Sequence, residues 1–169
     1  MDEIVNRVAK SPLVSVDLEE YLPQGERVLF DLKDVLFQGM ILREKDFREF
    51  VKTNDWAVYT GKNVGLICSA DAIVPTWAYM LLVTQLNGIA QTITFGGEEE
   101  VEKKLIDVAI DKCMEVNNFN DKKVVIKGCG NVKNVAYAYT AITDRLLPHV
   151  SSLMYGEPCS TVPIFKRKK

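Results

Sequence analysis

The sequence predicts an α/β fold: a single three-layer domain, residues 1–169, with a mostly parallel sheet, helices on both faces and extra N-terminal meander or edge strands. From Val64 onward, short apolar runs of strand length alternate with amphipathic segments of helix length. Such alternation is typical of right-handed βαβ units. A chain of 169 residues is also an ordinary length for one domain. The alternative is a mixed sheet with its helices mainly on one face.

The first third of the chain contains short elements. An amphipathic helix is expected at the start, with Ile4, Val5 and Val8 on one face. Apolar residues then predict three strands, followed by a helix that carries Phe47 and Val51. The expected helices are 1–10 and 47–52, and the expected strands are 14–18, 28–32 and 36–42.

The rest of the chain is more regular. The expected strands are 64–67, 92–95, 124–126 and 152–155. The expected helices are 75–88, 98–116 and one lined by apolar residues from Val135 to Leu146, which Pro148 ends. The pairs Glu99–Lys103 and Glu100–Lys104 support the second of these helices at i,i+4 spacing. Strand 152–155 is the last one expected before the tail, whose basic run 166–169 is expected to be a solvated end.

Composition and charge exclude several classes of protein. With 21 basic and 23 acidic residues, the net charge of −2 gives no reason to expect nucleic-acid binding. The longest strongly apolar stretch, 77–83, is too short to cross a membrane. The acidic start lacks a secretory signal, so we expect a cytoplasmic protein with reduced cysteines.

Three of the four cysteines follow predicted strands. Cys68, Cys129 and Cys159 come just after strands 64–67, 124–126 and 152–155. Because parallel strands end at one edge of a sheet, these three thiols are expected to lie together. Cys113 instead falls on the apolar stripe of helix 98–116 and is expected to be buried and inert.

Such a thiol cluster suits a zinc or iron site better than a hydrolase. Asp71 is a candidate fourth ligand, although it also suits a helix-capping role. His149 precedes strand 152–155 and is expected at the opposite edge of the sheet, where it cannot serve the thiols.

Two further features are candidate binding surfaces. Gly128, Gly130 and Asn131 form a short loop that could bind a substrate or an anion, with Glu157 nearby in the later loop. The helix 75–88 is apolar nearly all round, which indicates a core helix or one that also forms a homodimer interface.

Four motifs resemble a bacterial family catalogued as domain of unknown function 2480. They are residues 42–48 (LREKDFR), 68–81 (CSADAIVPTWAYML), 126–131 (IKGCGN) and 156–164 (GEPCSTVPI). The resemblance spans essentially the whole chain. It implies an accessory role in iron–sulfur assembly, and it carries over no catalytic residue.

The sequence thus predicts a small metal-binding protein, with zinc or iron held by Cys68, Cys129, Cys159 and Asp71. One alternative is a thiol-dependent enzyme with Cys68 or Cys129 as nucleophile. Another is a non-catalytic interaction domain whose cysteines are inert. The sequence alone leaves open whether the protein is an enzyme.

Overall fold

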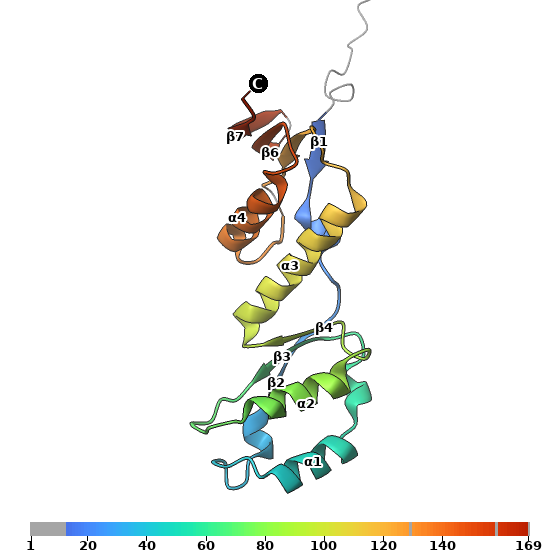
Figure 1. Ribbon diagram of the computed structural model, residues 1–169, viewed down its shortest axis with the longest axis vertical. Coiled ribbons are helices and arrows are strands. Elements are labelled where there is room, and N and C mark those ends of the chain that lie inside the picture. The colour runs from blue at the N-terminus through green and yellow to red at the C-terminus, as the bar shows by residue number, and fades with distance from the viewer. Residues whose placement is uncertain (1–12, 129, 158, 169) are drawn as a thin grey trace, which may run out of the picture. The chain divides into compact units, whose positions relative to one another are not determined.

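The computed structural model describes residues 13–128, 130–157 and 159–168 (Figure 1). The chain has a mixed α/β fold with mostly parallel strands, so the predicted fold class is confirmed. The strands form two sheets rather than one. The chain divides into two compact units: unit 1 comprises Met1–Leu22 and Ile106–Lys169, and unit 2 comprises Pro23–Leu105. The single domain expected over residues 1–169 stays a prediction.

Unit 2 is built on a parallel three-stranded sheet of order β2-β3-β4. Its strands are β2 (Arg27–Asp31), β3 (Asn63–Ile67) and β4 (Thr92–Phe95). Its helices are α1 (Glu44–Thr53), α2 (Thr76–Leu86), the short 3-10 helices at Leu32–Val35 and Trp56–Tyr59, and the first part of α3 (Glu98–Val116). The edge strand β2 pairs in parallel with β3.

Helices cover both faces of this sheet. One face packs against α1 and α2 through a continuous buried cluster that includes Phe30, Leu66 and Leu82. Side chains alternate along a strand, so Gly65 points to the opposite face. A Cβ atom at Gly65 would lie 2.8 Å from Cγ2 of Val101, which places the start of α3 on that face.

The strand predicted at 36–42 is wrong. The chain instead makes a tight reversal in which Phe37 and Ile41 form an isolated antiparallel bridge. Gln38 and Gly39 occupy the left-handed region, with φ angles of 52° and 69°. Two consecutive left-handed residues reverse the chain, so the apolar residues here cannot continue as a strand.

Unit 1 contains the second sheet, of order β1-β5-β6-β7. The first three strands are parallel, and β7 is antiparallel to β6. The strands are β1 (Leu13–Val16), β5 (Lys123–Ile126), β6 (Ser152–Glu157) and β7 (Ser160–Lys166). The helices are the 3-10 helix Leu18–Tyr21, the second part of α3 and α4 (Val135–Leu146). β7 replaces most of the expected tail.

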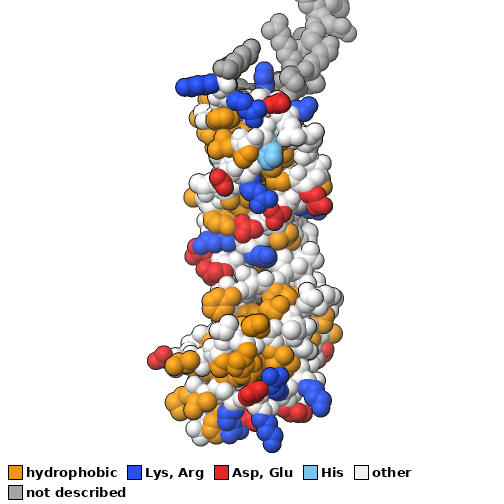
Figure 2. All heavy atoms as spheres, in the orientation of Figure 1, with side chains coloured by type: hydrophobic (Ala, Val, Ile, Leu, Met, Phe, Trp, Pro, Cys, Tyr) orange, Lys and Arg blue, Asp and Glu red, His pale blue; other side chains and the backbone are white. Residues whose placement is uncertain are grey.

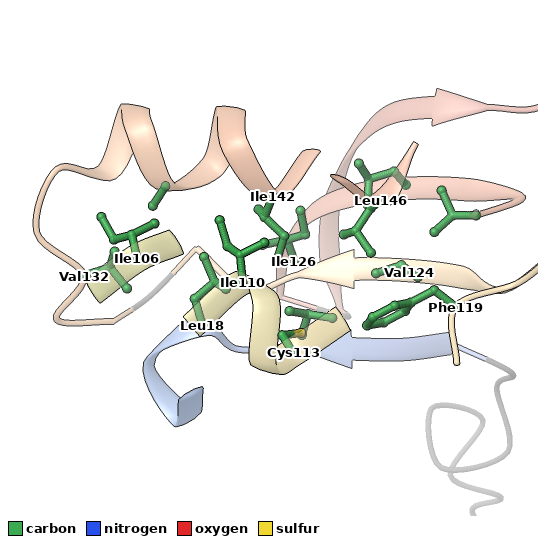
Figure 3. Close-up of a cluster of buried hydrophobic side chains, with 14 residues drawn as sticks. Leu18, Ile106, Ile110, Cys113, Phe119, Val124, Ile126, Val132, Ile142 and Leu146 are labelled. Atoms are coloured by element: carbon green, nitrogen blue, oxygen red, sulfur yellow. The ribbon is translucent and has the colours of Figure 1, made fainter. Parts of the chain in front are cut away.

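The core of unit 1 lies between its sheet and two helices (Figure 3). Ile110 of α3 and Ile142 of α4 belong to one buried cluster with Val124 and Ile126 of β5. Within the described residues, the two helices therefore pack on the same face of this sheet. Cys113 is completely buried in the same cluster, as predicted.

Two further expectations from the sequence concern the N-terminal helix and membrane-spanning segments. The helix predicted at 1–10 falls outside the described residues. No helix in the described part of the chain is both long enough and apolar enough to span a membrane.

A buried amide on β3 connects this strand to β4 and to the loop that precedes β2, and its loss should be costly. The Asn63 side chain is fully buried, and its Nδ2 donates to the backbone oxygens of Gln24 and Gly25 at 3.1 and 3.2 Å. Its Oδ1 accepts from the Thr92 hydroxyl at 2.9 Å. Asn63→Leu should lower the free energy of unfolding by about 1–3 kcal/mol, because two backbone carbonyls and the buried Thr92 hydroxyl then lose their partner.

Urea unfolding measures this effect, and Thr92→Val should reproduce about 1 kcal/mol of it. Gln91→Ala, at the exposed neighbouring position, is the matched control and should unfold like the parent. Equal stabilities of Asn63→Leu and Gln91→Ala would contradict the proposed role of this amide.

Candidate functional site

The cysteines predicted to share one site do not follow strands of one sheet. Cys68 comes directly after β3, in unit 2. Cys159 is exposed in the turn between β6 and β7, in unit 1. Cys129 lies outside the described residues. Parallel strands share a carboxyl edge only within one sheet, so the reasoning that brought the three thiols together fails.

The predicted metal-binding function is wrong. Among the residues that the structure describes, no group of three or more His, Cys, Asp or Glu side chains could hold a metal ion. Asp71 is exposed in the loop between β3 and α2, and Glu157 ends β6 opposite Ser160. The role in iron–sulfur assembly that the family resemblance implied was expected to use this three-cysteine site, and the described residues give it no such site.

The glycine loop after β5 is hydrogen-bonded to the carboxylate of Glu19. The Asn131 backbone N–H donates to Oε2 of Glu19 at 3.2 Å, and Asn131 Nδ2 donates to Oε1 at 2.9 Å. A Cβ atom at Gly130 would lie 3.0 Å from the same Oε2. Anion or substrate binding by Gly128, Gly130 and Asn131 stays a prediction, and it requires Glu19 to move.

Cys68 lines a pocket of about 750 Å³ at the carboxyl ends of β3 and β4, beside α2. We call this cavity the α2–β4 pocket. It lies beyond strand ends, where open parallel sheets commonly bind ligands. Its described lining consists of Leu66, Cys68, Ala72, Ile73, Val74, Thr76, Tyr79, Met80, Val83, Ile93, Thr94 and Phe95.

Aromatic and aliphatic side chains form most of this pocket. The rings of Tyr79 and Phe95 meet edge to face, with centroids 5.1 Å apart. Ile73, Met80 and Phe95 are 93%, 64% and 69% exposed. Figure 2 shows hydrophobic side chains gathered over the region of α2 and β4. The pocket is therefore apolar inside and has an exposed apolar rim.

The polar groups of the pocket are few. The Cys68 thiol is half-buried, and Sγ lies 3.7 Å from the backbone oxygen of Ala70. The pKa of Tyr79 is raised, first by burial and then by the nearby Cys68 and Asp31. A tyrosine is protonated at neutral pH even without this shift, so the Tyr79 hydroxyl can donate a hydrogen bond.

Asp31 is a residue that the sequence reasoning missed. It ends β2, and its carboxylate accepts the Ser69 hydroxyl at 2.5 Å and the Ser69 backbone N–H at 3.0 Å. Burial acts to raise the pKa of Asp31. The hydrogen bonds from Ser69 and Lys33, with the Lys33 charge, outweigh burial and hold the pKa at about 2. Asp31 thereby fixes the loop that follows Cys68.

The thiol-enzyme alternative gains no support from this geometry. The only histidine of the chain is His149, which belongs to unit 1 and whose Nδ1 lies 3.3 Å from Oδ1 of Asn120. As predicted, it precedes β6 and so lies at the amino end of that strand. Unit 2 therefore offers Cys68 no imidazole base, which a nucleophilic thiol commonly uses.

The low pKa of Asp31 predicts a pH dependence of stability. Its pKa is about 2 in the folded chain and 3.8 ordinarily, so its contribution is complete above about pH 4. That contribution is lost as the pH falls toward 2. Asp31→Asn should therefore lose less stability than the parent protein between pH 4 and pH 2 in urea unfolding.

Asp71→Asn is the control for this measurement, because Asp71 is an exposed aspartate in the same unit. It should keep the slope of the parent protein over this pH range. An identical slope in Asp31→Asn would overturn the assignment.

Thiol reactivity should follow burial. Burial raises the pKa of the Cys113 thiol to about 11 and also excludes reagent, although Tyr21 and Asn117 hydrogen-bond to it. In native protein at pH 8, iodoacetamide should label Cys159 rapidly and Cys113 only after unfolding. Peptide mapping by mass spectrometry separates the two sites. Rapid native labelling of Cys113 would show that this part of the core opens.

Comparison with known proteins is consistent with the motifs in the sequence. The model of the family described as "Protein of unknown function (DUF2480)" matches residues 2–167. No curated protein and no solved structure was found to match the chain. The match covers nearly every residue, and the chain belongs to the DUF2480 family.

Proposed function

We propose that unit 2 binds a small, mostly apolar organic molecule in the α2–β4 pocket. The observation that carries this proposal is the 750 Å³ cavity at the carboxyl ends of β3 and β4, with its apolar lining. Pockets that hold small organic ligands are commonly 300–1,000 Å³ in volume and combine apolar walls with a few polar groups.

The exposed rim supports the same proposal. Ile73, Met80 and Phe95 together leave a large apolar surface in water at the mouth of the pocket. Contiguous apolar surface of this kind usually marks a binding site. Covering each of these side chains would contribute about 25 cal/mol per Å² of apolar area removed from water.

The lining also limits the chemistry of the ligand. It contains no charged side chain among the described residues, so burial of a charged group would lack a counter-charge. The Tyr79 hydroxyl is a donor that could meet a carbonyl or ether oxygen, whereas the Cys68 thiol hydrogen is directed at the backbone oxygen of Ala70. The ligand class that fits is an uncharged molecule with an apolar body and one hydrogen-bond acceptor.

A second candidate is a homodimer through α2. Met80 and Val83 lie three residues apart on one face of this helix, and both are exposed. A second copy of the chain could cover them. A cytoplasmic location and the absence of nucleic-acid binding remain predictions from the sequence.

Binding of the neutral, polarity-sensitive dye Nile red tests the pocket. Met80→Glu should weaken dye binding by at least about tenfold, because it introduces a charge at an apolar wall. Val116→Glu is the matched control: Val116 is 60% exposed, against 64% for Met80, and lies in unit 1. The control should bind dye as the parent protein does.

Sedimentation velocity of the same variants separates the two candidates. A monomeric parent whose dye binding is lost in Met80→Glu supports the ligand pocket. A dimeric parent that Met80→Glu dissociates supports the homodimer instead. Equal dye binding by the parent and both variants would contradict the pocket proposal.

A further inference from the structure

Unit 1 contains a second pocket, of about 500 Å³, between α4 and the neighbouring strands β5, β6 and β7. We call it the α4 pocket. Its described lining consists of Ile126, Val135, Ala136, Tyr139, Thr140, Thr143, Asp144, Leu147, Tyr155 and Ile164. All of these residues belong to unit 1, so the pocket is separate from the one proposed above.

Three hydroxyl groups of this lining have already donated their hydrogens. Thr140 Oγ1 donates to the backbone oxygen of Ala136 at 2.7 Å, and Thr143 Oγ1 donates to that of Tyr139 at 2.6 Å. The Tyr139 hydroxyl donates to the backbone oxygen of Lys127 at 3.0 Å. Toward a ligand, such hydroxyl oxygens can only accept.

One carboxylate completes this set of acceptors. Asp144 is the one charged side chain in the described lining, and it makes no hydrogen bond or ion pair with another described residue. The adjacent Arg145 does not neutralise it, because its Nη2 is 2.7 Å from Oδ1 of Asp111. A ligand that donates hydrogen bonds and carries positive charge would complement this wall.

The apolar part of the pocket offers aromatic surfaces. The rings of Tyr139 and Tyr155 meet at 74°, with centroids 5.2 Å apart. Gly128 makes room for this arrangement, since a Cβ atom there would lie 2.6 Å from the Tyr155 hydroxyl oxygen. These ring faces offer a hydrophobic surface against which the apolar body of a ligand can pack.

We propose that the α4 pocket binds an organic ammonium ion, with the cationic group at Asp144 and an apolar body against Tyr139 and Tyr155. Three hydroxyls that accept, a carboxylate without a partner among the described residues, and two aromatic rings converge on this one ligand class. The inference does not depend on the proposed function of unit 2.

Two-dimensional ¹H–¹⁵N NMR titration of the full chain tests the proposal. The probes are 2-phenylethylamine, which is cationic at pH 7, and its neutral analogue 2-phenylethanol. The amine should shift amide signals of α4, β6 and β7, with a Kd on the order of millimolar for so small a ligand. The alcohol should bind several-fold more weakly, because it gains nothing from the Asp144 charge.

Asp144→Asn should weaken amine binding about fivefold and leave alcohol binding unchanged. Glu115→Gln, an exposed change of the same charge on α3, is the matched control and should bind the amine like the parent protein. Thr140→Trp, at an exposed helix position, should fill the pocket and block both probes.

Three outcomes would overturn the proposal. They are equal affinities for the amine and the alcohol, unchanged amine binding by Asp144→Asn, and shifts that map outside α4, β6 and β7. Because each variant changes an exposed side chain, its unperturbed NMR spectrum without probe verifies that the fold is intact.

Discussion

The arrangement of unit 2 depends on close packing against both faces of β3. At Gly65, a Cβ atom would lie 2.6 Å from the backbone oxygen of Gly96 and 2.8 Å from the Val101 side chain. Glycine at this strand position therefore permits α3 to begin directly against the sheet. Leu66 and Cys68 alternate to the other face, toward α2, and both line the α2–β4 pocket.

The charged carboxylate of Asp31, at the carboxyl end of the sheet in unit 2, does not line the α2–β4 pocket. Asp31 stands at the end of β2, and its carboxylate is held by Ser69 and Lys33 rather than lining the α2–β4 pocket. The hydrogen-bonded carboxylate at the end of β2 and the apolar cavity at the ends of β3 and β4 therefore have different roles. The first positions the loop after Cys68, and the second provides space for an uncharged ligand.

The sequence predicted the positions of individual helices and strands better than the pairing of the strands into sheets. The helix predicted at 98–116 has those bounds, and the helix predicted from the apolar residues between Val135 and Leu146, ended by Pro148, is α4. Periodicity reports which residues face a core, but not which strand pairs with which, so it could not reveal two sheets. The prediction of a cysteine cluster was wrong for this reason, because it assumed that all the strands belong to one sheet. β7 was missed because it contains Pro163, which argues against a strand in the sequence although proline is tolerated in an edge strand such as β7.

The two pockets also show why binding chemistry was hidden in the sequence. Thr140 and Thr143 read as ordinary polar helix residues, yet their bonds to backbone oxygens four residues earlier leave only acceptors toward the α4 pocket. Tyr79 retains its proton beside Cys68 and so presents a donor to the α2–β4 pocket. Whether a hydroxyl donates or accepts is set by its partners in three dimensions. The two proposed ligands differ accordingly. The α2–β4 pocket suits an uncharged molecule that accepts a hydrogen bond, and the α4 pocket suits a cation that donates hydrogen bonds.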